Sequence, residues 1–301
     1  MKKRLLLLFS LAAGSLYADV RVSDLELRGG DEASRKAYFA QSVRIWGYSG
    51  YPEDSRERIH LITLANTRCL FLLKLSGRTD PQERLHAQLG MLKPSSANWY
   101  ANEFFSFSVN GVSPSEASVE IVKLNSGTER GSVSFLYSGR DFTAELTVTL
   151  ADNDDKLLLE FKPESRGDAA QKNTCEVSFL CYPSSHAGGW QEGLQLRRRE
   201  ALTPVRTLPD SGKSVSLGND EPWILFYDLA YDVKGNRGEG PCALMFDPKE
   251  CISREVMIGN YACGLKFRYP MNMASHFILW DFHNWSNESA RRFMSSLVYE
   301  Y

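Results

Sequence analysis

The chain has 301 residues, of which 43% are hydrophobic, 24% charged and 12% aromatic, an ordinary globular composition with enough apolar residues for a substantial core. Its 35 basic and 37 acidic residues nearly balance, which argues against a nucleic-acid or anionic-membrane partner. After the first twenty residues no apolar run reaches 18 residues, so a later transmembrane helix is excluded.

The first 18 residues have the layout of a secretory signal peptide. Basic residues at 2–4 precede an apolar run over 5–14, and small residues follow up to Ala18. The run is shorter than the ~20 residues that a spanning helix needs, and no cysteine lies just after it for lipidation. We therefore expect cleavage and export of a soluble mature protein, periplasmic or extracellular, without a membrane anchor. Residues 19–301 would carry 32 basic and 37 acidic side chains, a net charge of about −5.

The dominant pattern of the mature chain is alternation of apolar and polar residues, which predicts half-buried antiparallel strands. It is clearest over 141–150, where every second residue from Phe142 to Leu150 is apolar. The predicted strands lie, in chain order, at 20–27, 61–65, 69–75, 104–109, 119–124, 131–138, 141–150, 156–162, 175–181, 223–228, 242–246, 254–258, 261–269 and 276–282.

Helical signals occur in three places. Residues 80–83 supply an N-cap, a proline at the first helical position and a glutamate at the third, and leucines follow at 85, 89 and 92. From Glu288 onward, apolar residues at 290, 293, 297 and 298 have helical spacing. Whether residues 32–39 form a short helix is left open.

All six cysteines lie in the mature chain, at 69, 175, 181, 242, 251 and 263. An even number in an exported protein permits up to three disulfides. Cys242 and Cys251 flank a turn-like segment and could pair across a hairpin, whereas buried free thiols are the alternative. Because no Cys-x-x-Cys occurs, zinc-ribbon and thioredoxin chemistry are disfavoured. The oxygen-rich run 152–155 lacks the glycine and final glutamate of a calcium loop. We predict no metal site and no cofactor.

These elements predict an all-β fold: one large antiparallel β-sandwich, supersandwich or jelly-roll-like, with one or two short helices and a C-terminal helix. A single domain would span 19–301, with a sheet or subdomain boundary near 188–210. In strand pattern, length and aromatic content the chain is similar to large exported carbohydrate-handling β-sandwiches, including the mutarotase-like supersandwiches. No motif of those families is matched residue by residue, so no active site follows from the similarity.

The strongest candidate site follows the last predicted strand. In an extended chain Asp281, His283 and Trp285 share one face, and the alternating apolar residues at 278, 280 and 282 take the core face. An indole stacks on a sugar ring while carboxylate and imidazole bond its hydroxyls. Alternatively Asp281 orients His283 as a base. A purely structural interpretation also stands, in which Asp281 caps a turn and Trp285 anchors the following helix.

Two further groups are weaker candidates. Tyr227, Asp228, Tyr231 and Glu239 lie around a glycine-rich loop, a common place for ligand contacts. His186 lies just past a predicted strand, beside glycines and a tryptophan, where it could act as a base or contact a sugar. An exposed hairpin and an exposed loop histidine are the structural alternatives.

Three functions remain open. The first is a carbohydrate-binding module, with Trp285, His283 and Asp281 as main contacts. The second is an enzyme acting on a sugar or polysaccharide, such as a hydrolase, lyase or epimerase. There His283 or His186 would be the base, and one of the carboxylates named above the acid. The third is a structural or envelope-interaction protein without a small-molecule site. The oligomeric state is left open.

Overall fold

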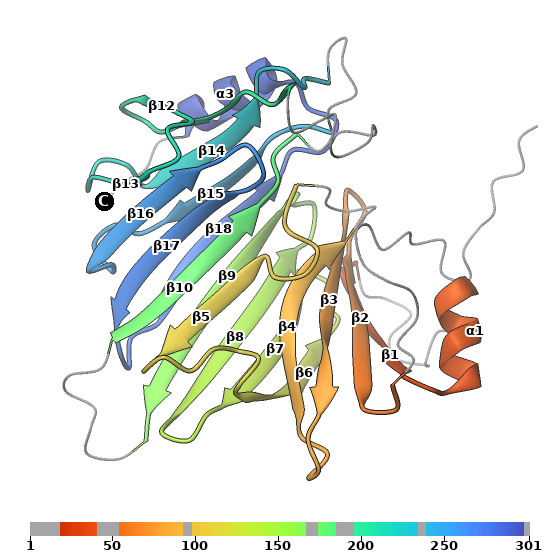
Figure 1. The fold of residues 1–301 in the computed structure, drawn as a ribbon. Coiled ribbons are helices and arrows are strands. Elements are labelled where there is room, and N and C mark those ends of the chain that lie inside the picture. Colours follow the sequence, from red (N-terminus) through yellow and green to blue (C-terminus); the bar gives the residue numbers. More distant parts are fainter. Residues whose placement is uncertain are drawn as a thin grey trace, which may run out of the picture.

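A computed structural model describes residues 19–40, 54–92, 98–166, 174–184, 196–233 and 239–297. Over these residues two antiparallel nine-stranded sheets pack as a β-sandwich, which confirms the predicted all-β fold (Figure 1). The predicted signal peptide, residues 1–18, lies outside the described residues. Within them, no helix is long and apolar enough to cross a membrane.

The order of strands in space differs from their order in the chain. Sheet 1 contains, from edge to edge, β1 (Arg21–Arg28), β2 (Glu57–Ala65), β3 (Leu70–Thr79), β4 (Leu85–Leu92), β5 (Phe105–Val109), β10 (Thr174–Cys181), β17 (Cys263–Pro270), β16 (Ser253–Ile258) and β13 (Ser214–Ser216). Sheet 2 contains β12 (Thr207–Pro209), β11 (Arg199–Leu202), β14 (Trp223–Asp228), β15 (Cys242–Phe246), β18 (Ser275–Asp281), β9 (Lys156–Ser165), β8 (Phe142–Ala151), β7 (Arg130–Ser138) and β6 (Ser118–Asn125). The described helices are α1 (Glu32–Ala40) and α3 (Asn287–Ser296).

The main core lies between the two sheets and follows directly from the alternation. Every second residue of β8, from Phe142 to Leu150, is buried there, as is every second residue of β10. Phe179 of β10 meets Phe277 of β18 across the sandwich, with ring centroids 4.7 Å apart. Such edge-to-face pairs add about 0.5–1.5 kcal/mol each to the area that they bury.

A second core covers the outer face of sheet 2. Helix α3 lays Ala290 and Met294 on apolar residues of β14, β15 and β18. The hydroxyl of Ser286 caps the helix by accepting from the N–H of Ser289 at 3.2 Å. The predicted C-terminal helix is therefore confirmed, and it covers the part of this face that β14, β15 and β18 form (Figure 1).

The helix predicted over 80–92 is wrong, because residues 85–92 form strand β4. One carboxylate oxygen of Asp80 accepts from the N–H groups of Gln82 and Arg84, at 2.9 Å each, and closes a turn between β3 and β4. Glu83 completes this turn at φ +59°. An aspartate followed by proline suits a helix start and a tight turn equally, since both need its side chain to accept from the next N–H groups. The alternation over 87–91, buried toward the core, settles the choice.

Strand β6 forms one edge of sheet 2 and pairs only with β7 among the described strands. Its register against β7 shifts between Ile121 and Lys123, so Val122 has no partner residue and its side chain is 48% exposed. This β-bulge bends the edge strand and increases its local twist.

All six cysteines lie among the described residues and are free thiols. Cys242 begins β15 of sheet 2, whereas Cys251 precedes β16 of sheet 1. The hairpin that would have paired them is absent, because the chain crosses from one sheet to the other between them. The alternative interpretation, cysteines packed as small hydrophobic residues, describes the four buried ones.

Burial raises the pKa of every cysteine thiol, to about 11 at Cys251 and about 12 at Cys69 and Cys175. Because the thiolate is the reactive form, we expect iodoacetamide at pH 8 to label the native protein slowly at all six positions. After unfolding without reductant, six thiols should be labelled, as counted by mass spectrometry. A count of four or fewer would contradict the free-thiol structure.

Candidate functional site

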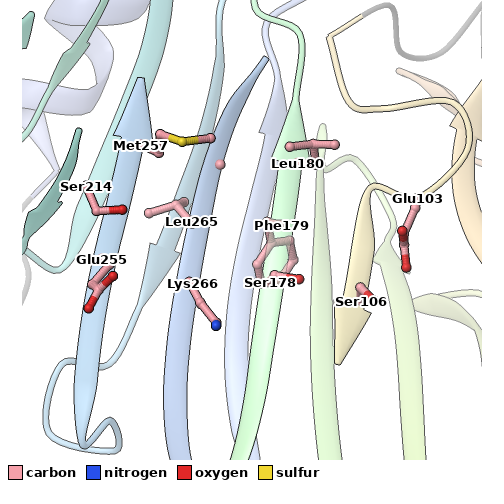
Figure 2. A pocket seen from close by; sticks show the side chains of 11 residues that line it. Glu103, Ser106, Ser178, Phe179, Leu180, Ser214, Glu255, Met257, Leu265 and Lys266 are labelled. Carbon is pink, nitrogen blue, oxygen red and sulfur yellow. The ribbon is translucent and has the colours of Figure 1, made fainter. Parts of the chain in front are cut away.

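An open groove of about 350 Å³ crosses the outer face of sheet 1, over β5, β10, β17, β16 and β13 (Figure 2). Side chains that line it from the outer face are those of Glu103, Ser106, Ser178, Leu180, Ser214, Glu255, Met257 and Lys266, around Gly264. Phe179 and Leu265 border it from below, with side chains in the core. The groove therefore combines residues from five strands that lie far apart in the sequence.

A polar row crosses the groove because of the strand register. Ser106 of β5 is paired with Ser178 of β10, and Ser178 with Lys266 of β17. Lys266 is in turn opposite Glu255 of β16. Directly opposite residues have Cβ atoms about 4.5–5.5 Å apart, so these side chains form one continuous row. The Lys266 ammonium also lies 2.7 Å from the Glu176 carboxylate, in an exposed ion pair beside the groove.

The next row forms an apolar floor. Gly264 lies between Leu180 on one neighbouring strand and Met257 on the other. A Cβ placed on Gly264 would meet only Leu180 Cδ1, at 3.6 Å, and the Phe179 carbonyl oxygen, at 3.7 Å. The missing side chain therefore leaves a depression between two apolar side chains, rather than making room for other backbone.

Three tyrosines lie just beyond this floor. The N–H of Tyr100 donates to the carbonyl of Leu180 at 3.1 Å, and the Tyr100 hydroxyl is 3.2 Å from that of Tyr261. The rings of Tyr182 and Tyr261 meet edge to face, with centroids 5.6 Å apart. Tyr261 is 45% exposed. The groove thus runs from a charged polar row, over an apolar floor, to an aromatic end.

A buried charged cluster, the Arg197–Arg199 cluster, adjoins that aromatic end. The guanidinium carbons of Arg197 and Arg199 lie 4.3 and 4.4 Å from the centre of the Tyr182 ring. Nitrogens of both reach the same Asp228 Oδ2, at 3.6 and 3.7 Å, and all three side chains are at most 2% exposed. The other Asp228 oxygen accepts two backbone N–H groups. Burial, and then the charge of Arg199, lowers the pKa of Arg197.

The extended row of Asp281, His283 and Trp285 that the alternation predicts is not formed, although His283 and Trp285 are both exposed. Their role as ligand contacts stays a prediction. Strand β18 ends at Asp281, and the chain turns through Asn284 at φ +66°. Asp281 shares its face with Phe277 and Leu279, which belong to the core between the sheets, while the aromatic residues of the other face pack under α3. Toward its end β18 is therefore packed on both faces, whereas the sugar-binding interpretation needs the face of Asp281 to be open.

Each member of that row has a separate environment. Asp281 Oδ1 accepts from the Asn98 amide at 2.7 Å, and His283 is exposed in the turn. The Trp285 ring packs 5.2 Å from Phe282 and 5.8 Å from Phe293 of α3. This is the helix-anchoring role that the structural interpretation described.

The residues of the weaker candidate sites also lie in different parts of the structure. Asp228 and Tyr231 join the Arg197–Arg199 cluster, where the Arg197 guanidinium carbon is 5.4 Å from the Tyr231 ring. Tyr227 points to the opposite face of β14, under α3, and donates to Glu200 at 2.8 Å. Glu239 is half-buried, and His186 lies outside the described residues.

The groove was missed because its residues occupy outward positions of alternating strands, which normally face solvent. Their assembly depends on β10 lying between β5 and β17, which single-strand patterns do not encode. The sequence does contain a signal for the arginine cluster. Residues 197–199 are three consecutive arginines, inside the stretch 188–210 that was interpreted as a sheet or subdomain boundary. Within the described ranges, no group of His, Cys, Asp or Glu side chains could hold a metal ion.

No protein-family model and no curated protein matches the chain. Among solved structures, the galactosidase domain of an alpha-galactosidase–sucrose kinase covers 70% of this chain at 8% identity and a TM-score of 0.38. An alpha-N-acetylgalactosaminidase variant from Bifidobacterium bifidum covers 79%, at 9% identity and 0.43. A provisionally identified aldose 1-epimerase from Escherichia coli K12 covers 70%, at 7% identity and 0.41.

The matched parts make up 40%, 37% and 95% of those three chains, so this chain spans about two fifths of the first two. All three are named for reactions on sugars. At these identities and TM-scores the similarity is distant, and it carries nothing about the chemistry of the groove.

Proposed function

We propose that the protein binds a carbohydrate in the groove on the outer face of sheet 1. The observation that supports this proposal is the juxtaposition, on one open face, of an apolar floor, a row of hydroxyl, ammonium and carboxylate groups, and an aromatic end. Sugars carry apolar C–H faces and a fringe of hydroxyls, so they need both kinds of surface within one ring's width.

The roles of the side chains follow from their chemistry. Ser178 and Lys266 can donate to sugar oxygens, and Glu255 accepts from sugar hydroxyls. Leu180 and Met257 contact a C–H face over the depression at Gly264. The tyrosines beyond the floor would stack on an adjoining ring. Helix α3 covers part of the outer face of sheet 2, whereas the groove is open to solvent (Figures 1 and 2).

Two predictions from the sequence belong to the same proposal. Residues 1–18 would direct export, and residues 19–301 would fold as a single domain. An exported protein meets extracellular or envelope polysaccharide, which is consistent with an open groove able to accept part of a long chain.

Gly264→Phe is expected to weaken glycan binding at least tenfold, because the added ring fills the depression between Leu180 and Met257. The measurement is a glycan array on residues 19–301, followed by isothermal titration calorimetry on the best ligand. Since the nearest side-chain atom to a Cβ at Gly264 is 3.6 Å away, the thermal midpoint should change by only a few degrees.

Thr149→Phe is the matched control, because it adds the same ring to an outward position of a central strand in the other sheet. It should leave binding unchanged. If folded wild-type protein binds no glycan on the array, or if Gly264→Phe binds as tightly as wild type, the proposed function is wrong.

A further inference from the structure

The Arg197–Arg199 cluster contains more hydrogen-bond donors than acceptors. Arg197 Nε, Arg199 Nε, Arg199 Nη2 and the Ser184 hydroxyl are all buried and have no hydrogen-bond partner among the described residues. On the acceptor side of the cluster only Asp228 Oδ2 is likewise without a hydrogen bond there, at 3.6 Å from Arg197 Nη1 and 3.7 Å from Arg199 Nε. Ser184 is adjacent to Pro183, whose carbonyl lies 3.4 Å from Arg197 Nη1. Buried polar groups without partners cost roughly 1–3 kcal/mol each, so folded proteins rarely leave several together.

The charges of the cluster are also unbalanced. Over the described residues, both guanidiniums make ion pairs with Asp228 alone, so one positive charge is in excess. The remaining contacts of Arg199 Nη1 are to neutral carbonyls, of Tyr261 at 2.7 Å and of Gly259 at 3.3 Å. A buried charge needs a counter-charge as well as hydrogen bonds. One additional acceptor with negative charge would satisfy both deficits.

We propose that Ser184, Arg197 and Arg199 form a binding site for an oxyanion, namely the carboxylate or sulfate of an acidic carbohydrate. Planar guanidinium groups bind such oxygens with paired N–H bonds, and the serine hydroxyl adds a third donor. Carboxylate and sulfate present the same acceptor chemistry, so the experiment distinguishes them.

The assignment to a carbohydrate rests on the proposed function, because the cluster lies beside the aromatic end of the groove. Arg199 bonds the carbonyl of Gly259, which is two residues beyond the groove residue Met257. Tyr182, which both guanidiniums approach, is two residues beyond Leu180. Two residues of strand correspond to about 7 Å, the order of one sugar ring. A sugar over the floor would therefore bring a substituent of the next ring toward the cluster. Because Arg197 and Arg199 are at most 2% exposed, the side chains that cover them would have to move for the oxyanion to reach them.

The first test requires no sugar. We expect millimolar sodium sulfate or sodium acetate, each at constant ionic strength, to raise the thermal midpoint of the wild type by about 3–5 °C and then to saturate. Sulfate also stabilises proteins generally, but that rise is linear and continues to high concentration. Arg199→Gln should lose the saturable part, and Ser184→Ala should shift it to higher concentration.

Arg268→Gln is the control, since Arg268 is an exposed arginine of β17 in sheet 1, outside the cluster, and should retain the saturable rise. If Arg199→Gln does not fold, Ser184→Ala and Arg197→Lys provide the same comparison. A wild type without a saturable rise for either anion, or a rise that survives in the cluster variants, would overturn the oxyanion site.

The second test uses matched neutral, uronate-containing and sulfated oligosaccharides. Acidic oligosaccharides should bind at least tenfold more tightly than their neutral counterparts, and Arg199→Gln should remove that preference while neutral binding persists. The better of the two acidic series identifies the oxyanion. Saturable sulfate stabilisation without binding of any glycan would support the site and reject the carbohydrate function. Glycan binding that is equal for neutral and acidic chains would reject the site alone.

Discussion

Glu221→Ala is expected to lower the free energy of unfolding by about 3 kcal/mol and the thermal midpoint by roughly 6–12 °C. Glu221 is 2% exposed and accepts from four groups: two nitrogens of Arg206 at 2.8 Å each, the Thr203 hydroxyl at 2.8 Å and the Gly218 N–H at 2.6 Å. Alanine removes all four bonds and leaves the buried Thr203 hydroxyl without this acceptor.

The same carboxylate gives the stability a predictable pH dependence. Burial alone raises the pKa of Glu221, but the bonds from Arg206, Gly218 and Thr203 outweigh it and hold the pKa below the ordinary value of 4.5. A depressed pKa means that the folded state favours the charged form. The stabilisation is therefore complete above about pH 4.5 and is lost as the pH falls through the folded value. Glu221→Ala should remove this part of the acid sensitivity.

Chemical denaturation at pH 7 and pH 4 measures both effects. Glu288→Ala is the control, because Glu288 makes an exposed ion pair with Arg292 one helical turn away and should contribute under 0.5 kcal/mol. A loss below 1 kcal/mol in Glu221→Ala would show that the four bonds do not stabilise this part of the fold.

Lys74→Met is expected to stabilise the protein at pH 7 by about 1–2 kcal/mol. Lys74 of β3 is 5% exposed, on a face of sheet 1 that it shares with buried Leu61. Its ammonium has one described hydrogen bond, to the Asn102 amide oxygen at 3.1 Å, and no carboxylate partner among the described residues. Methionine has similar length, fills the same space and removes the cost of burying the charge.

The pH dependence that Lys74 gives the wild type has the same sign as that of Glu221, but it lies in the alkaline range. Burial lowers the pKa of Lys74 to about 8, below the unfolded value of about 10.4. Between these values the unfolded chain binds more protons, so the lysine makes wild-type stability rise with pH, an effect absent from Lys74→Met. Lys162→Met, at a half-exposed position, controls for other groups that titrate in this range. A destabilised Lys74→Met would mean that the amine has a partner that compensates its charge.

Most strands could be predicted because burial between two sheets imposes a period of two on any sequence. The predicted bounds of β14 and β15 agree with the structure, and those of the other predicted strands differ by a few residues. The prediction failed for the residues of β4 because Asp80, in the turn before this strand, has the same local chemistry as a helix cap. The prediction of a helix relied on the local hydrogen bonds of Asp80, whereas burial of the residues that follow it against the core determines that they form a strand.

The candidate site could be predicted only in part, because it depends on which strands become neighbours. Asp228 and Tyr231 were singled out for their chemistry, and the structure brings both to one cluster. The partner residues Arg197 and Arg199 lie about 30 positions away and meet Asp228 only through the pairing of β11 with β14. The Trp285 ring is 37% exposed, but it also packs on Phe282 and on Phe293 of α3, a contact that the alternation of a single strand does not predict.

The bulge in β6 has a consequence for self-association. Among the described strands β6, with its eight residues, pairs on one side only, and an open strand edge can template a strand from a second molecule and begin aggregation. The shift between Ile121 and Lys123 breaks the even spacing that such an added strand would need. Glu120 and Lys123, exposed on either side of Val122, add charges that an intruding strand would have to desolvate. We therefore expect this bulge to hinder the pairing of a second molecule along the edge of β6, while Val122 itself has no partner residue on β7.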